Sequence, residues 1–227
     1  MIPGFLSRRI TVPSKKQKKS SDKLFQLKIT LTGSPLPVWR RVVVRAGAPL
    51  ELVHEVFQIV MGWSNTHLHV FHVDDRAITD ADTANATPAG KKGPRYEDEA
   101  DLDLQDIISK KDDSFVYEYD MGDGWNHEVV LEQIIEQEEA GSFLAHCLSG
   151  KRACPPEDVG GIAGYANFID ALEDSEHPEH EDMLNWIGCS FDPDSFDARL
   201  VNLRIAQFEQ DFSNKFKEAL ESVLLKN

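Results

Sequence analysis

Apolar and polar residues alternate over residues 25–31, which is the clearest pattern near the start of the chain. Four apolar side chains would share one face of an extended segment: Phe25, Leu27, Ile29 and Leu31. This period of two predicts a half-buried strand. The sequence Gly33-Ser34-Pro35 then predicts a turn, and the apolar residues at 38–44 predict a second strand.

The spacing changes to a helical period after Pro49, a residue that suits the first turn of a helix. Apolar residues recur three or four positions apart at Leu50, Val53, Phe57 and Val60. This predicts an amphipathic helix over residues 49–61, ending before Gly62. Residues 67–73 predict a third strand.

Residues 74–100 contain few apolar side chains, so they predict a long exposed loop, with a short helix at 102–108 after it. Two further strands are predicted at 114–120 and 125–134. The Met121-Gly122-Asp123-Gly124 segment between them is a tight hairpin signal.

The second half of the chain favours helices. Residues 138–163 predict a loop, and helices are expected at 165–172, 179–187, 197–208 and 214–225. We therefore predict an α+β fold with a ββαβ, β-grasp-like start and a further β-hairpin in one mainly antiparallel or mixed sheet, followed by a helical C-terminal half. The expected organisation is an arm over 1–23, one domain over 24–210 and an amphipathic helix over 211–227.

Charge is divided unevenly between the arm and the body. Residues 1–23 hold seven of the 24 lysines and arginines and one acidic residue, whereas the remainder has 17 basic and 38 acidic residues. The body would repel a phosphate backbone, so any contact with nucleic acid is expected through the basic arm alone. The alternative is that residues 1–23 form a solvated tail.

The composition indicates a cytoplasmic protein with no membrane segment. The three cysteines are too sparse for a disulfide framework, and no run of apolar residues approaches the length of a membrane span. The N-terminal residues lack the apolar stretch and cleavage site of a secretory signal, although their basic character leaves an organelle-targeting peptide open.

Several unusual strings occur in a fixed order along the chain. They are LKITLTGSPLPVWRRVVV, HEVFQIVMGWSNTHLHVFHV, FVYEYDMGDGWNHEVVLE, CLSGKRACPPEDVGGIAGY, HPEHEDMLNWIG and FDPDSFDARLVN. In these strings, which run from about residue 24 to 205, the chain resembles the plasmid pRiA4b ORF-3-like family.

That resemblance implies an association with plasmids and insertion elements in bacteria and archaea. Some members carry a resolvase label, but a serine resolvase needs a nucleophilic serine amid arginines, and no such cluster occurs here. The chain has Met121 where the family usually has phenylalanine, and it lacks a further cysteine often found near Val159. The second departure weakens any metal site that would use that thiol.

The first group of candidate catalytic residues surrounds the predicted hairpin turn. Asp120 and Asp123 flank the turn and His127 follows on the next strand, so two carboxylates and an imidazole could hold a divalent metal or act as acid and base. The structural alternative is that both aspartates bond the turn backbone and that His127 is a hydrogen-bonded core residue.

A second candidate is a metal site made by histidines. His67 and His69 would share one face of a strand and His72 the other, and His127 would supply a third ligand. Metal-free, hydrogen-bonded histidines are the alternative.

A third candidate uses the cysteines. Cys147 and Cys154 with His177 and His180 would make a four-ligand zinc set, although the spacings fall outside the usual ranges. Neighbouring Lys151 and Arg152 would also favour a thiolate nucleophile at Cys154. Burial of both thiols as small apolar side chains is the competing interpretation.

Two functions follow from these residues. The first is a non-enzymatic module that binds a protein or peptide partner, associated with plasmid or mobile-element biology, with no cofactor. The second is a metal-assisted or acid/base hydrolase that uses the Asp120, Asp123 and His127 corner, with Glu157, Asp158 or Cys154 opposite. The choice depends on whether the corner and the Cys-Pro-Pro-Glu-Asp segment face one another across a pocket.

Overall fold

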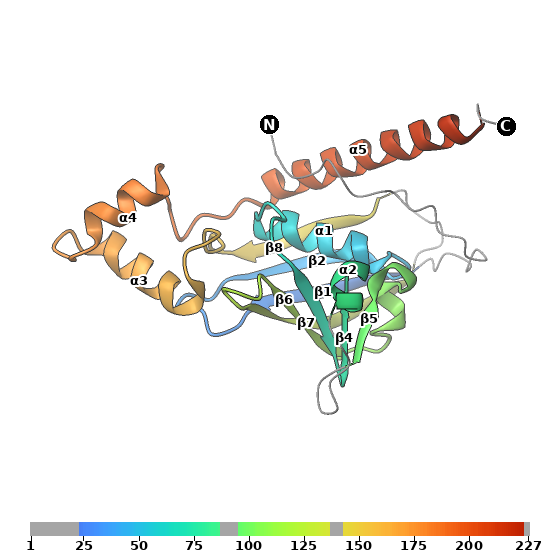
Figure 1. The fold of residues 1–227 in the computed structure, drawn as a ribbon, viewed down its shortest axis with the longest axis horizontal. Helices are drawn as coiled ribbons and strands as arrows, with labels where there is room; N and C mark the ends of the chain where they lie inside the picture. The colour runs from blue at the N-terminus through green and yellow to red at the C-terminus, as the bar shows by residue number, and fades with distance from the viewer. Residues whose placement is uncertain (1–22, 87–94, 137–142, 225–227) are drawn as a thin grey trace.

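A computed structural model describes residues 23–86, 95–136 and 143–224, and its main feature is one eight-stranded sheet (Figure 1). The strands are β1 (Lys23–Leu31), β2 (Trp39–Arg45), β3 (His69–Val73), β4 (Arg76–Thr79), β5 (Arg95–Asp98), β6 (Ser114–Tyr119), β7 (Trp125–Glu136) and β8 (Ala145–Lys151). Their order across the sheet is β5-β4-β3-β6-β7-β1-β2-β8. Strands β4 and β5 run parallel, and the other neighbouring strands run antiparallel.

Five α-helices and two short 3₁₀ turns accompany the sheet. They are α1 (Leu50–Met61), α2 (Ala81–Ala86), the turns at Glu99–Asp101 and Leu104–Asp106, α3 (Gly161–Glu173), α4 (His180–Ile187) and α5 (Ala198–Leu224). Helix α1 lies over the sheet, α3 and α4 lie beyond one end of it, and α5 runs beside β8 (Figure 1). No helix in the described part of the chain combines the length and the apolar character that crossing a membrane would require.

The core forms between α1 and one face of the sheet. The alternation predicted for residues 25–31 is present, because the apolar side chains of β1 are buried and those between them are partly exposed. Phe57 of α1 is fully buried against Phe71 of β3 and against Phe115 and Tyr117 of β6. Burying one such side chain contributes about 1.5–3 kcal/mol, so this aromatic cluster fixes α1 on the sheet.

The opposite face of the central strands is polar. The guanidinium of Arg41 in β2 donates to both carboxylate oxygens of Glu132 in β7, at 2.6 and 2.8 Å. Gln26 of β1 donates to the same carboxylate at 2.8 Å. The pairing register of β1 and β7 shifts at this point, which leaves Glu132 as the extra residue of a bulge.

The predicted α+β class and the ββαβ start are confirmed, as is the helical C-terminal half. The further hairpin, β6–β7, is inserted into the middle of the sheet, where β7 pairs with β1 and β6 pairs with β3. This insertion brings the hairpin turn next to the segment that precedes β3, and that placement creates the site described below.

Three local predictions were wrong. Residues 74–100 contain β4, α2 and β5 rather than one long loop, and β8 lies within the loop predicted at 138–163. Short strands at or near a sheet edge gain their stability from pairing, so they leave little pattern in the sequence. The two helices predicted at 197–208 and 214–225 are one continuous helix, α5. The basic arm lies almost wholly outside the described residues.

Candidate metal site between the hairpin turn and the 152–160 loop

The hairpin turn between β6 and β7 holds the first component of the site. Asp120 adopts a left-handed backbone conformation with φ 54°, and its carbonyl accepts the amide N–H of Gly124 at 2.6 Å. One carboxylate oxygen, Oδ1, accepts the amide N–H of Gly122 at 2.9 Å. The turn therefore uses Oδ1 for its own geometry and leaves Oδ2 for contacts outside the turn.

The segment that joins α1 to β3 approaches the same turn. The amide of Asp120 donates to the carbonyl of Leu68 at 2.9 Å, which fixes the neighbouring residue His67 beside the turn. Before His67, the segment is held to α1 through Asn65, whose amide N–H donates to Oε1 of Gln58 at 3.1 Å.

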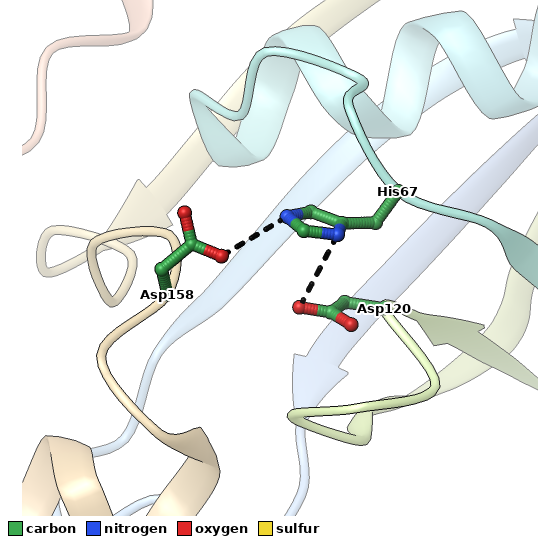
Figure 2. Close-up of side chains that lie close together, drawn as sticks. All are labelled: His67, Asp120 and Asp158. Carbon is green, nitrogen blue, oxygen red and sulfur yellow. Dashed lines mark ion pairs between the residues drawn. The ribbon is translucent and has the colours of Figure 1, made fainter.

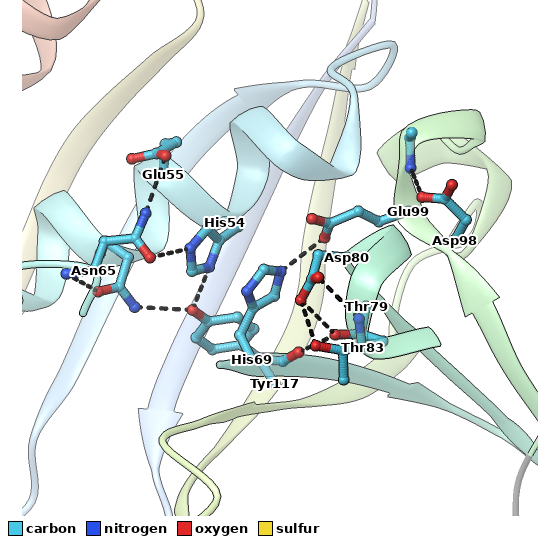
Figure 3. A network of polar contacts seen from close by, with 12 residues as sticks. His54, Glu55, Asn65, His69, Thr79, Asp80, Thr83, Asp98, Glu99 and Tyr117 are labelled. Atoms are coloured by element: carbon cyan, nitrogen blue, oxygen red, sulfur yellow. Dashed lines mark hydrogen bonds and ion pairs between the residues drawn. The ribbon is translucent and has the colours of Figure 1, made fainter. Parts of the chain in front are cut away.

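A buried network of polar side chains anchors Asn65 (Figure 3). Gln58 donates to the Tyr117 hydroxyl at 3.0 Å, so that hydroxyl is free to donate to Nδ1 of His54 at 2.7 Å. His54 then donates from Nε2 to Oδ1 of Asn65 at 2.7 Å. The side-chain amide of Asn65 donates from Nδ2 to the Glu55 carboxylate at 3.0 Å. The chain of donors defines one tautomer of His54 and holds the 63–67 segment on the core.

The loop over residues 152–160 lies opposite the hairpin turn. The indole N–H of Trp63 donates to the carbonyl of Pro155 at 3.1 Å, and the amide N–H of Gly160 donates to Oδ2 of Asp123 at 3.2 Å. Gly161 lies so close to the turn that a Cβ atom at this position would stand 2.5 Å from the Asp123 carbonyl oxygen. The corner and the Cys-Pro-Pro-Glu-Asp segment therefore face one another.

Glu157 fastens this loop to the core. Its Oε1 atom accepts the Tyr119 hydroxyl at 2.7 Å and the Ser64 amide at 3.2 Å, and its Oε2 accepts the Ser64 hydroxyl. Burial, together with the hydrogen bond to the Glu157 carboxylate, raises the pKa of the Tyr119 hydroxyl, which stays protonated as a donor. Because three donors occupy its carboxylate, Glu157 positions the loop.

Three side chains from the three segments converge between these supports (Figure 2). Nδ1 of His67 lies 3.8 Å from Oδ2 of Asp120, and Nε2 of His67 lies 3.2 Å from Oδ1 of Asp158. One ligand atom from each residue lies within 4.8 Å of the other two, and this is the one such group of three among the residues that the structure describes. Asp158 also has a left-handed backbone, with φ 60°.

Two members of the group, His67 and Asp120, line a pocket of about 350 Å³ that opens to solvent. The other lining residues include Asn65 and Thr66, together with the exposed residues Leu68 and Met121. The lining contains one acidic residue, Asp120, and no lysine or arginine. Such a pocket attracts cations.

His127, which the sequence places near this corner, lies in the core instead. It is fully buried, its Nδ1–H donates to the Tyr117 carbonyl at 3.1 Å, and its ring packs edge-on against Trp63. Burial lowers the pKa of His127 to about 4, so the imidazole is neutral near pH 7. His127 is therefore not part of the group around His67.

The other candidate histidines also separate. His67 lies before β3 begins, so the strand alternation that would give it the same face as His69 does not extend to it. His69 is buried, with Nε2 2.7 Å from Glu99, and its ring stacks on His54 at 3.5 Å (Figure 3). His72 contacts Glu118 at 2.7 Å. The structure brings His67 together with aspartates rather than with histidines.

Cys147 and Cys154 are both buried in the hydrophobic core. Burial raises the pKa of the Cys154 thiol to about 12 despite the nearby Arg40, so this environment does not favour a thiolate. His180 of α4 donates its Nδ1–H to the Ala171 carbonyl of α3 at 2.7 Å. Within the described residues, no three-ligand group includes these side chains.

Sequence reasoning named all three residues: it placed Asp158 opposite the Asp120 corner, but it assigned His67 to a separate group of histidines. Their combination depends on the insertion of the β6–β7 hairpin next to β3, and no spacing in the sequence indicates that pairing. The positioning roles of Ser64 and Asn65 were missed, and the only available signal was their place directly after the Gly62 helix end.

The fold and the site together define an α+β protein with a candidate cation site at one end of a mixed sheet. The chain belongs to the plasmid pRiA4b ORF-3-like protein family, whose model matches residues 23–200. It is 37% identical over 185 residues to the uncharacterised protein y4hQ of Sinorhizobium fredii, covering 80% of this chain and 89% of that relative.

A solved structure also resembles the chain. The protein of unknown function MM3350 from Methanosarcina mazei Go1 matches with a TM-score of 0.67 and 33% sequence identity, over 78% of this chain and 96% of that one. Neither relative has an assigned function, so the comparisons establish the family and the fold.

Proposed function

We propose that the protein binds one divalent metal ion through His67, Asp120 and Asp158 and uses it to activate water in a hydrolytic reaction. The observation that carries this proposal is the convergence of one imidazole and two carboxylates from three separate segments within 4.8 Å. One nitrogen and two oxygen ligands suit Zn²⁺ or Mn²⁺ and leave coordination positions open for water and substrate. A bound ion of this kind would lower the pKa of its water.

The hydrogen bonds around His67, Asp120 and Asp158 favour a preorganised metal site. Asp120 keeps one oxygen for the turn and presents the other to His67, as expected for a ligand oriented by its surroundings. Asp158 has a side chain that is 73% exposed, so it can rotate to direct a carboxylate oxygen at an ion shared with His67 and Asp120. The hydrogen bonds that Glu157 accepts from Tyr119 and Ser64 hold the backbone of that loop in place.

A metal titration of the full-length chain tests the proposal. After treatment with a chelator, wild-type protein is titrated with Zn²⁺ or Mn²⁺ in a calorimeter, with one ion per chain expected. The variants His67→Ala and Asp158→Asn should weaken binding at least tenfold, because each removes one of three ligands. Glu181→Gln, which removes an exposed carboxylate from α4, should bind as the wild type does.

The hydrolytic part needs a separate measurement. Metal-loaded protein is assayed with p-nitrophenyl acetate and with bis-p-nitrophenyl phosphate, and any activity should disappear in both ligand variants. If the protein bound metal but showed no hydrolysis that depends on His67 and Asp158, the hydrolase proposal would be rejected and the metal site retained. Equal affinity in wild type, His67→Ala and Asp158→Asn would overturn both parts.

A second function, recognition of a protein or peptide partner, is favoured by the apolar side chains beside the pocket. Leu68 and Met121 are each more than two-fifths exposed, and such residues at the rim of a polar site are typical of binding surfaces. Contact with nucleic acid through residues 1–23 stays a prediction, because almost all of that arm lies outside the described residues. A cytoplasmic location also stays a prediction.

A further inference from the structure

A second hollow adjoins the site and shares one of its residues. It has a volume of about 310 Å³ and lies between the loop that precedes α3 and the helix α4. Its lining consists of Asp158, Val159, Asp182, Met183 and Trp186. Asp158 therefore contacts His67 on one side and borders the hollow on the other.

The lining combines a fixed aromatic ring with two carboxylates. Trp186 packs edge-to-face on the buried ring of Phe168, with centroids 5.8 Å apart, and still exposes 46% of its surface. The side chains of Asp158 and Asp182 are exposed at the same hollow. An aromatic face next to carboxylates recognises a cation, and a planar guanidinium both stacks on tryptophan and pairs with carboxylates.

We propose that this hollow binds the arginine side chain of a peptide or protein partner. The guanidinium would lie against Trp186 and pair with Asp158 and Asp182, while Val159 and Met183 contact its methylene stem. The charge of the molecule agrees with such a partner, because residues 24–227 hold 38 acidic and 17 basic side chains. The hollow goes beyond the proposed metal site and does not depend on it.

A pair of matched ligands tests the charge requirement. Nα-acetyl-arginine amide and its citrulline analogue have nearly the same shape, but only the first is cationic. Tryptophan fluorescence of the full-length protein is followed during titration with each, since Trp186 is exposed, whereas Trp39 is half-buried and Trp63 and Trp125 are buried. The arginine ligand should change the signal saturably, and the citrulline ligand should bind at least tenfold more weakly. Equal binding of the two ligands would overturn the proposal.

Variants then assign the contacts. Trp186→Leu removes the aromatic face and should weaken binding of the arginine ligand about two- to fivefold, measured by calorimetry because the reporter is lost. Asp182→Asn should weaken it by a similar or larger factor. Glu181→Gln removes the same charge from the same turn of α4 outside the lining. If Glu181→Gln weakened binding as much as Asp182→Asn, the arginine ligand would be attracted by the general negative charge of α4 and the specific site would be rejected.

The shared residue separates this proposal from the metal site. Asp158→Asn should impair both arginine and metal binding, Asp182→Asn only arginine binding, and His67→Ala only metal binding. A metal ion held by Asp158 would also repel the guanidinium, so saturating Zn²⁺ should lower the affinity for the arginine ligand. By linkage, the arginine ligand should lower the affinity for Zn²⁺ by the same factor. Arginine binding that persists in a protein without metal affinity would support the hollow alone. Metal binding without arginine binding would reject it.

Discussion

Nε2 of His67 lies 3.2 Å from Oδ1 of Asp158, and the two residues reach this distance through supports of different kinds. His67 is held by the backbone bond between Asp120 and Leu68, whereas Asp158 is held through its neighbour Glu157. The adjacent acids Glu157 and Asp158 therefore have separable roles, one in the position of the loop and one in its chemistry.

Glu157→Gln and Asp158→Asn should separate stability from ligand binding. A glutamine at 157 would place an amide N–H group against the Ser64 or Tyr119 donors, so we expect a loss of about 1–3 kcal/mol in the free energy of unfolding. Asp158→Asn should leave that free energy nearly unchanged, because its side chain is mostly exposed, while weakening metal binding at least tenfold. Urea denaturation and metal titration of both variants check this, and the reverse order of stabilities would contradict the assignment.

Gly161→Ala should force the loop away from the hairpin turn. Gly161 has φ +68°, and its Cβ would meet the Asp123 carbonyl at 2.5 Å. Gly124 has the same φ of +68° with nothing within 4 Å, so Gly124→Ala carries only the conformational cost, about 1–2 kcal/mol. Thermal or urea unfolding should show Gly161→Ala to be the less stable by at least about 1 kcal/mol.

Metal affinity gives the same pair of variants a second comparison. Gly161→Ala should also lose metal affinity, since Asp158 is carried by the displaced loop, and Gly124→Ala should lose less. Equal effects of the two substitutions would mean that the close approach of loop and turn has no energetic consequence.

How much of this could be predicted from the sequence depends on whether a residue's environment is local. The strand at residues 25–31 and the helix that contains Phe57 follow from periodicity, because each buries one face against the core. Strand β4 covers only Arg76–Thr79 and forms through pairing with β3 and β5, which the sequence does not encode locally.

The candidate site has the same division. The turn at Asp120 and the approach of the 152–160 loop rest on glycines and aspartates that the sequence displays, and both were expected to matter. The replacement of His127 by His67 as the imidazole of the site depends on where β3 begins and on which face of β7 is covered by Trp63. Those are tertiary properties, and a spacing rule applied to either strand cannot provide them.

Thiol reactivity should distinguish Cys189 from the other two cysteines. Cys189 is exposed, whereas Cys147 and Cys154 are buried and burial raises the pKa of both thiols. Native protein should therefore release one equivalent of thionitrobenzoate with Ellman's reagent at pH 8, and three after denaturation. In Cys189→Ser the native reaction should vanish. Rapid labelling of Cys154 in the native state would revive a thiolate nucleophile at that position.

His127 should make the fold sensitive to acid over a defined interval. Its pKa is about 4 in the folded protein against 6.5 ordinarily, so the unfolded chain takes up the proton first as the pH falls. The stability linked to this group is fully present above pH 6.5 and is lost progressively toward pH 4, by roughly 3 kcal/mol. Below that interval both states are protonated, and the contribution becomes constant.

Substitution of His127 by phenylalanine isolates the contribution of this residue to the pH dependence of the free energy of unfolding. His127→Phe keeps a ring against Trp63 and removes the titrating nitrogen, so its free energy of unfolding should fall less steeply between pH 6.5 and 4 than that of the wild type. All other ionisable side chains are the same in both proteins, so their contributions cancel in the difference. His146→Gln, which removes an exposed imidazole, serves as the control for the loss of a surface histidine. Parallel profiles for His127→Phe and the wild type would show that His127 is protonated in the fold or reaches solvent, and would return it to consideration as a site residue.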